Sequence, residues 1–283
     1  KTVAEILSRQ GHDGGFVMWP ESPASSPWVS AYAVWTLHEA ARRGVPVPAP
    51  AMTRAKQYLR RQLEVGKDEI SRAAAPLLLD VLAELGAPDP GYMSQLFDER
   101  RDLPVFSRAL LLHAMAVSKQ PSGPVAELTR ELEATLHLEA DRAFVGDDSG
   151  GRYATLMDSP TRSTALVLRG LLAARKDHPL GARLARGLLA SRKGGTWRST
   201  QETAFALLAL DDYRTAQEAV KPDFVARLWF DREKVAEYDF RTGNQKRGAA
   251  AQRGTARQSL IPTARLTSGN LVFEKEGAGT LFY

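Results

Sequence analysis

A helical pattern that repeats along most of the sequence limits the possible fold more than any single motif does. Each unit pairs a helix made almost entirely of Ala, Leu and Val with a helix that has one polar face. Turn signals precede the apolar helices, including glycine–aromatic turns at residues 13–19 and 194–197. The apolar helices recur at intervals of about 35 to 55 residues, which is the period of an array of helical hairpins.

The apolar helices must lie inside the fold. A helix that is apolar on most sides has to be buried on most sides, and its amphipathic partner can cover it. The economical arrangement is a ring of inner helices surrounded by outer ones, an alpha/alpha toroid. The sequence predicts inner helices at residues 29–41, 73–85, 105–118, 161–174 and 200–210. It predicts outer helices at 51–63, 92–99, 124–138 and 179–192, and a short tail helix from Thr215.

Several inner helices have recognisable start signals. Ser26-Pro27 and Ser159-Pro160 each place a hydroxyl before a proline at the first helical position, where the missing N–H costs nothing. Ser199 and Glu202 have the spacing of a capping box, in which each side chain satisfies a free backbone N–H. Helix capping therefore accounts for these residues without a catalytic role.

After residue 221 the period changes from helical to alternating. Residues 224–230 and 235–240 predict a β-hairpin, and 259–266, 270–274 and 280–283 predict further short strands. We therefore expect a toroid over 1–220 and a small antiparallel β module over 221–283. The last predicted strand is interrupted at Tyr283, so we expect the module to be incomplete.

Composition excludes several kinds of site. The 38 Lys and Arg face 33 Asp and Glu that are mostly interleaved along helices, and the sequence has no cysteine for a disulfide or thiolate ligand. No segment is apolar over the length of a membrane helix. One basic run has no acid or aromatic residue within it, and we interpret it as a surface loop rather than a nucleic-acid site: Arg241, Lys246, Arg247, Arg253 and Arg257.

Residues that commonly carry chemistry are present but scattered. We expect structural roles for the five histidines, with no metal and no cofactor, because His38, His113 and His137 are each predicted on a separate helix, with no histidine or carboxylate placed to share a metal. The pairs Asp147-Asp148 and Asp211-Asp212, predicted on loops, are the type of carboxylate a toroidal glycosidase uses, but adjacent aspartates are more typical of turns and caps.

Aromatic and capping residues near the starts of inner helices are the candidate site. Two interpretations apply to the aromatic rings: they line the mouth of a central concavity, or, as we favour, they pack the turns against neighbouring hairpins. The candidates are Trp19, Trp28, Tyr32, Trp197, Ser199, Gln201 and Glu202. The turn from Gln10 to Phe16 also resembles the Gln-Trp turn of triterpene cyclases, whose aspartate-rich acid motifs do not occur in this sequence.

Two blocks of sequence resemble the thioester-domain region of bacterial alpha-2-macroglobulins. Residues 10–41 contain Asp-Gly-Gly-Phe, Trp-Pro and Ser-Pro-Trp-Val-Ser-Ala-Tyr, and residues 159–213 contain Gly-Thr-Trp-Arg-Ser-Thr-Gln-Glu-Thr. Residues 224–283 resemble the β segment that follows this toroid, which the resemblance implies to be a β-sandwich or CUB-like segment.

This resemblance implies part of a periplasmic or secreted, broad-spectrum protease trap. In the family a protease cuts a bait region elsewhere in the parent chain, and a Cys–Gln thioester on the toroid captures the attacker. The family's Cys-x-Glu-Gln segment lies upstream of the Asp-Gly-Gly-Phe block, and this sequence starts between them without a cysteine. Five predicted inner helices, where the family has six, agree with the loss of one hairpin.

The leading interpretation is thus a non-catalytic part of an endopeptidase inhibitor. Its implied partners are target proteases, met through the full-length parent, and neighbouring macroglobulin-like domains, with no nucleic acid and no membrane insertion. The alternatives are a toroidal carbohydrate- or isoprenoid-processing enzyme and a helical protein-interaction scaffold. A converging acid pair in the central cavity would favour the enzyme.

Overall fold

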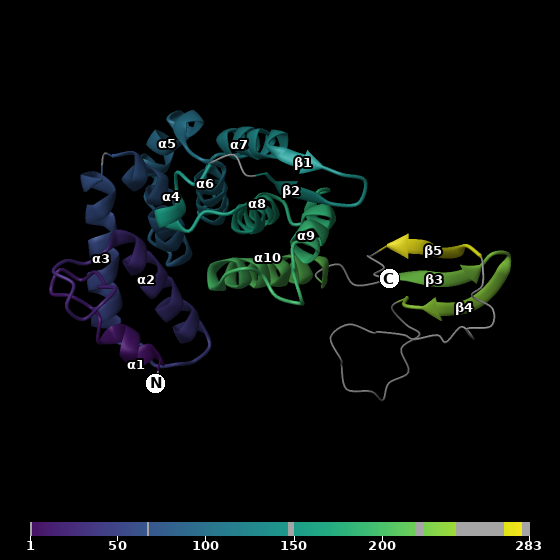
Figure 1. The fold of residues 1–283 in the computed structure, drawn as a ribbon, viewed down its shortest axis with the longest axis horizontal. Coiled ribbons are helices and arrows are strands. Elements are labelled where there is room, and N and C mark those ends of the chain that lie inside the picture. The colour runs from purple at the N-terminus through teal and green to yellow at the C-terminus, as the bar shows by residue number, and fades with distance from the viewer. Residues whose placement is uncertain (1, 67, 147–149, 219–222, 242–268, 279–283) are drawn as a thin grey trace. The chain divides into compact units, whose positions relative to one another are not determined.

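The computed structural model describes residues 2–66, 68–146, 150–218, 223–241 and 269–278. The chain divides into two compact units, Lys1–Tyr213 and Arg214–Tyr283. The first contains the helices, except for the last residues of the final one, and the second contains the larger sheet (Figure 1). The type of domain that each unit represents remains a prediction.

The first unit is built around the predicted inner helices. These are α2 (Pro27–Arg42), α4 (Glu69–Glu84), α6 (Val105–Val117), α8 (Pro160–Ala174) and α10 (Thr200–Glu218). They begin and end within a few residues of the predicted bounds, except that α10 continues past residue 210 to Glu218. In α4 and α8 nearly all residues after the first turn are buried, as their Ala- and Leu-rich sequences require. The predicted set of inner helices is confirmed.

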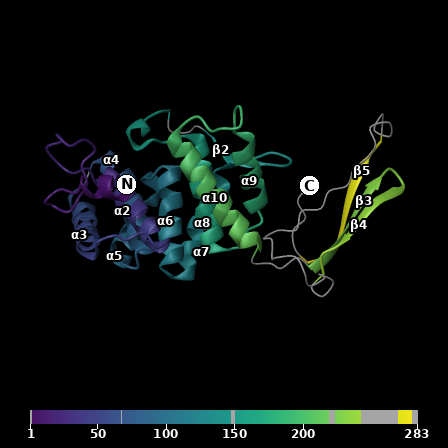
Figure 2. The ribbon, with the colours of Figure 1, turned by 90° about the horizontal axis from the view of Figure 1, so that it is seen from below.

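The outer helices alternate with the inner ones along the chain (Figures 1 and 2). They are α3 (Ala49–Val65), α5 (Pro90–Asp98), α7 (Ser122–Ala134) and α9 (Gly181–Ala190), and a short α1 (Thr2–Leu7) precedes the ring. In α3 and α9 the buried residues lie on one face, so the outer helices are amphipathic as expected. Short 3-10 helices span Arg100–Asp102 and Ala154–Leu156.

Within the described residues, the inner helices form a closed ring. α2 packs on α4, α4 on α6 and α6 on α8. α10 completes the ring, because Phe205 stacks on Trp35 of α2 with ring centroids 6.0 Å apart, and Asp212 pairs with Arg169 of α8. The fold is therefore a toroid of helical hairpins followed by a small antiparallel β unit, as the sequence predicted.

Two local predictions were wrong. The chain does not start a separate tail helix at Thr215, because α10 continues without a break to Glu218. The outer helix predicted over 124–138 ends at Ala134, and the next residues form a hairpin of β1 (Leu136–Leu138) and β2 (Ala143–Val145). Ala143 and Val145 are buried, and β2 packs on α8 and α9, so tertiary packing selects the strand over helix continuation.

The serine caps form as predicted. Ser26 Oγ accepts the N–H of Val29 at 3.4 Å, and Ser159 Oγ accepts the N–H of Arg162 at 3.2 Å. At the start of α10, Ser199 Oγ accepts the N–H of Glu202 at 3.1 Å. The Glu202 carboxylate accepts the N–H of Arg198 at 2.9 Å, one residue before the position a standard capping box uses.

The second unit contains a three-stranded antiparallel sheet in the order β4-β3-β5. β3 (Asp223–Phe230) and β4 (Glu233–Asp239) form the predicted hairpin, with Asp231 in the left-handed region at φ 53°. β5 (Leu271–Ala278) is longer than the predicted strand at 270–274 because it pairs with β3 along its whole length. The predicted strands at 259–266 and 280–283 lie outside the described residues.

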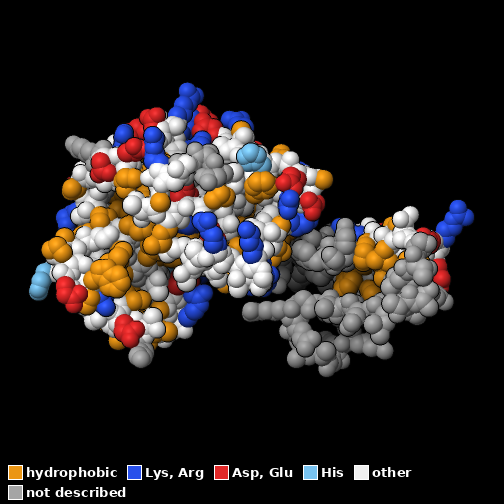
Figure 3. Space-filling view, in the orientation of Figure 1, with side chains coloured by type: hydrophobic (Ala, Val, Ile, Leu, Met, Phe, Trp, Pro, Cys, Tyr) orange, Lys and Arg blue, Asp and Glu red, His pale blue; other side chains and the backbone are white. Residues whose placement is uncertain are grey.

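Charges of both signs are interspersed on the surface of the helical unit (Figure 3). Of the predicted basic loop, Arg241 is described and pairs with Asp239, whereas residues 246–257 lie outside the described part of the chain. None of the described helices has the length and apolar composition that a membrane crossing requires.

Candidate functional site

Polar side chains from all five inner helices meet inside the ring. We call this group the axial cluster, and it consists of Trp35 from α2, Asp80 and Glu84 from α4, His113 from α6, Arg169 from α8 and Asp212 from α10. Asp80, His113 and Arg169 are each less than 9% exposed. Residues contributed by every inner helix can meet only near the centre of the ring.

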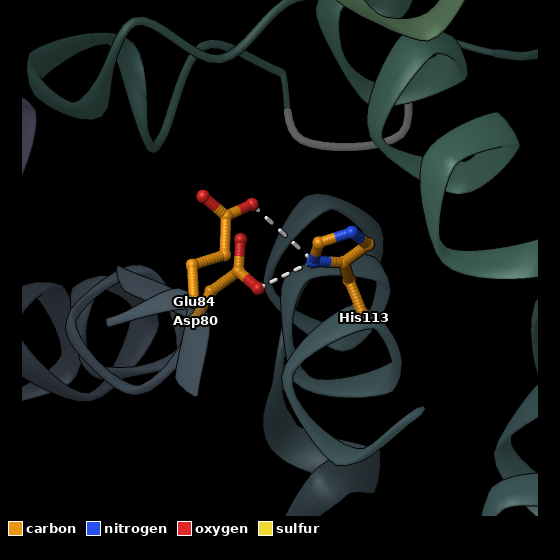
Figure 4. Close-up of side chains that lie close together, drawn as sticks. All are labelled: Asp80, Glu84 and His113. Carbon is orange, nitrogen blue, oxygen red and sulfur yellow. Dashed lines mark hydrogen bonds and ion pairs between the residues drawn. The ribbon is translucent and has the colours of Figure 1, made fainter. Parts of the chain in front are cut away.

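The contacts in the axial cluster are short and specific. His113 Nδ1 lies 2.6 Å from Asp80 Oδ1 and 4.0 Å from Glu84 Oε1. Figure 4 shows both carboxylates of α4 directed at this nitrogen. Because a carboxylate only accepts, Nδ1 carries the proton in this hydrogen bond.

Arg169 and Trp35 complete the hydrogen bonding of the acids. Arg169 donates from Nε to Asp212 Oδ2 at 2.7 Å and from Nη2 to Glu84 Oε1 at 3.2 Å. Trp35 Nε1 donates to Glu84 Oε2 at 2.6 Å. Burial and the nearby Asp80 raise the pKa of Glu84, although Arg169, His113 and Trp35 oppose the shift. Burial alone would lower the pKa of Arg169, but Asp212, Asp80 and Glu84 outweigh it and raise that pKa.

A second buried arginine lies in an aromatic cage. Arg162, near the start of α8, is fully buried, and its guanidinium lies 4.9 to 5.4 Å from the ring centroids of Phe205, Trp28 and Phe106. Its Nη2 donates to the Tyr32 hydroxyl at 3.2 Å. Among the described residues, its Nε and Nη1 have no hydrogen-bond partner. Burial raises the pKa of Tyr32, and Arg162 partly offsets this.

The acid pair that would favour an enzyme is thus present, but its surroundings are those of a packed core. Asp80 and Glu84 converge, yet Asp80 Oδ1 is bonded to His113, and the two oxygens of Glu84 accept hydrogen bonds from Arg169 and Trp35. A catalytic acid has to reach a substrate atom within hydrogen-bond distance. The arrangement can hold a proton or a cation, and it links all the inner helices electrostatically.

The aromatic residues proposed from sequence separate into two groups. Trp28 is buried and makes an edge contact with the half-buried Tyr32 at 5.2 Å between ring centroids. Both belong to the aromatic cage. Trp19 is 65% exposed and lies apart from them in the turn before α2, so packing does not explain this ring.

The candidates around residue 200 form a separate cluster at the start of α10. Trp197 is half-buried, and its Nε1 donates to Leu188 O at 3.0 Å and Ser191 Oγ at 3.1 Å, which ties the turn to the end of α9. Ser199 and Glu202 form the cap described above. Gln201 is half-buried, and its Oε1 has no partner among the described residues.

Gln10, in the cyclase-like turn, has a structural role. Its Nε2 donates to Gly14 O at 3.0 Å and to Ala51 O at 2.9 Å, and Arg54 donates to its Oε1 at 2.8 Å. The side chain therefore fixes the first glycine–aromatic turn to the start of α3.

The structure corrects the interpretation of the histidines and paired aspartates. His113 has two carboxylates beside it, contrary to the expectation that none is placed to share a metal with it. His137 lies on β1 rather than on a helix. Asp211 and Asp212 lie inside α10 rather than on a loop, and Asp212 pairs with Arg169. Asp147 and Asp148 lie outside the described residues.

Sequence reasoning missed the axial cluster although a signal was present. Asp80, His113 and Arg169 each interrupt an otherwise apolar run at the centre of an inner helix. A charged residue at such a position has to be paired, because an unpaired buried charge is very costly. The sequence alone does not show which helices supply the partners.

Comparisons with known proteins agree with the resemblance found in the sequence. No protein-family model matches the chain. An alpha-2-macroglobulin homolog from Nostoc sp. is 27% identical over 99% of this chain. The chain spans 15% of the length of that relative.

Solved structures share the fold. Native Escherichia coli alpha-2-macroglobulin, from domain MG7 to the C-terminus, matches 84% of this chain and 36% of its own with a TM-score of 0.60 and 20% identity. Salmonella alpha-2-macroglobulin reacted with methylamine matches 83% of this chain and 15% of its own with a TM-score of 0.58 and 22% identity. The sequence match over nearly the whole chain, together with the shared fold, supports membership of this chain in the alpha-2-macroglobulin family.

Proposed function

We propose that this chain acts as a non-catalytic module of a bacterial alpha-2-macroglobulin-like inhibitor of endopeptidases. The observation that carries the proposal is the match to the Nostoc alpha-2-macroglobulin homolog across 99% of this chain but only 15% of that protein. Inhibition then belongs to the longer protein, and its bait region and enclosing domains are supplied elsewhere. The proposed location is periplasmic or secreted.

The internal chemistry of the module supports a structural role. The acids of the axial cluster are engaged by His113, Arg169 and Trp35 within the packed ring. The 283 residues contain no cysteine, so this chain cannot itself supply the thiol of an acyl-thioester. The proposed partners are target proteases, reached through the longer protein, and its neighbouring macroglobulin-like domains.

The test compares the isolated chain with the longest natural protein that contains it. Each is incubated with trypsin and with elastase, and the hydrolysis of a large protein substrate is followed. We expect the longer protein to protect the substrate and the isolated chain to leave hydrolysis unchanged. Unprotected substrate in the presence of the longer protein would overturn the inhibitor proposal.

A second measurement tests the non-catalytic assignment. The isolated chain is incubated with labelled methylamine or trypsin, and its intact mass is measured. We expect no covalent adduct, because no acyl–sulfur bond is available for attack. Methylamine uptake or a stoichiometric trypsin complex would show an activity that lies in this chain itself.

A further inference from the structure

Three side chains of the axial cluster have the composition and spacing of a metal site. One ligand atom from each of Asp80, Glu84 and His113 lies within 4.8 Å of the others. In a tetrahedral zinc site the ligand atoms are about 3.4 Å apart, given metal–ligand distances near 2.0 to 2.1 Å. The observed separations of 2.6 and 4.0 Å from His113 Nδ1 lie on either side of that value. To reach it, the Asp80 carboxylate has to move away from Nδ1 and the Glu84 carboxylate toward it.

The charges of the cluster call for additional positive charge. Asp80, Glu84 and Asp212 carry three negative charges when ionised, and Arg169 carries one positive charge. With a neutral His113 the group is left with two uncompensated negative charges beside buried side chains. A buried net charge is costly unless it is paired. One divalent cation brings the sum to zero.

The donor atoms define the class of cation. An imidazole nitrogen with carboxylate oxygens suits zinc and neighbouring transition metals, whereas magnesium and calcium prefer sites made of oxygens alone. Trp35 Nε1 already orients Glu84 through Oε2, which is the supporting contact that metal-binding carboxylates usually have. Arg169 donates to Glu84 Oε1, but a carboxylate oxygen has a second lone pair for a metal.

We propose that Asp80, Glu84 and His113 bind one divalent transition-metal ion of the zinc class, which joins α4 to α6 inside the ring. His113 binds through Nδ1, and the proton that this nitrogen carries moves to Nε2 when the metal enters, so that the imidazole stays neutral. This site is independent of the proposed inhibitor function.

The first experiment measures metal retention by the full 283-residue chain. The chain is treated with a chelator, equilibrated with Zn²⁺ or Co²⁺, and dialysed before its metal content is measured. We expect one ion per chain and, with Co²⁺, the visible absorption of a low-coordinate site.

Matched variants identify the ligands. His113→Asn and Glu84→Gln should each weaken binding by more than about 100-fold, and Trp35→Phe by about 10- to 100-fold, since it removes only a supporting contact. His178→Asn is the control, because His178 is buried, pairs with Glu133 at 2.9 Å and lies outside the group of Asp80, Glu84 and His113. This variant should bind as the unmodified chain does.

The outcomes are decisive even if one variant folds poorly. Circular dichroism identifies folded variants, and the thermal midpoint of the unmodified chain should rise with Zn²⁺ and fall again with chelator. No retained metal in the folded unmodified chain overturns the proposal. Equal retention by a folded His113→Asn or Glu84→Gln chain also overturns it and places any bound ion elsewhere.

Discussion

Arg162 and Arg169 project from the same face of α8, two helical turns apart, and both are buried in surroundings of opposite character. Arg162 lies among aromatic rings with one hydrogen bond, to Tyr32. Arg169 lies among carboxylates, bonded to Asp212 and Glu84. α8 therefore contributes one arginine to an aromatic layer and one to an ionic layer inside the ring.

Replacing these two arginines by methionine should have different effects on stability. Arg169→Met leaves Asp212 and Glu84 without their cation and should cost about 3 to 5 kcal/mol of unfolding free energy. Arg162→Met removes a desolvated charge that has no carboxylate partner among the described residues, and should be neutral or stabilising. Urea denaturation of both variants measures the difference. Equal losses would show that the aromatic cage compensates Arg162 as fully as the acids compensate Arg169.

Substituting Gly187 tests how the β1–β2 hairpin, which the sequence did not predict, packs on α9. A Cβ built at this position would lie 2.1 Å from Ala143 O, so Gly187→Ala should push β2 away and cost about 1 to 3 kcal/mol. Gly123→Ala in α7 is the control, since its Cβ would meet no atom within 4 Å, and it should gain about 0.5 kcal/mol. Denaturation midpoints provide the comparison, and an unchanged midpoint for Gly187→Ala would mean that the β1–β2 hairpin does not pack there.

Trp197→Ala should lower stability by about 2 kcal/mol, less than the roughly 3 to 5 kcal/mol of a fully buried aromatic side chain, because this ring is half-buried. Trp197→Phe keeps most of the ring but removes the hydrogen bonds to Leu188 and Ser191, so its loss should be about 1 kcal/mol. Denaturant midpoints of both variants separate packing from hydrogen bonding. An unchanged denaturant midpoint for Trp197→Ala would show that the turn does not depend on the ring.

His178 should make the ring less stable in mild acid. Its Nδ1 accepts the Leu180 N–H at 3.3 Å, and its Nε2 faces Glu133 at 2.9 Å, which is the pattern of a neutral imidazole. Burial lowers its pKa below the ordinary 6.5 and Arg175 adds to this, while Glu133 and Asp177 oppose the shift. The folded state therefore binds fewer protons than the unfolded state, and stability is lost as the pH falls below about 6.5.

The pH dependence is measured with His178→Asn, whose amide oxygen can replace Nδ1 as an acceptor. The variant should lose less stability than the unmodified chain between about pH 7 and pH 5. Identical pH profiles would assign the acid sensitivity to other groups.

The sequence determined the helices because their signals are local. The apolar runs of α4 and α8 require burial. Ser159-Pro160 marks the start of α8, and the predicted and observed first residues differ by one. Propensity and capping act over one or two turns, so they can be recognised without any partner. The same local signals failed at residues 136–138, where packing of β2 on α8 and α9 selects a strand.

Only the tertiary structure decided the contents of the ring. Trp28 and Tyr32 were identified from sequence as aromatic residues at a helix start, but the arginine they surround comes from 130 residues further along the chain. Asp80, His113 and Arg169 were visible as charged residues within apolar helices, yet their partners lie on other helices, since Asp80 of α4 pairs with His113 of α6 and Arg169 of α8 pairs with Asp212 of α10. Electrostatic partners are set by distance in space, and helix periodicity fixes only which face a side chain occupies.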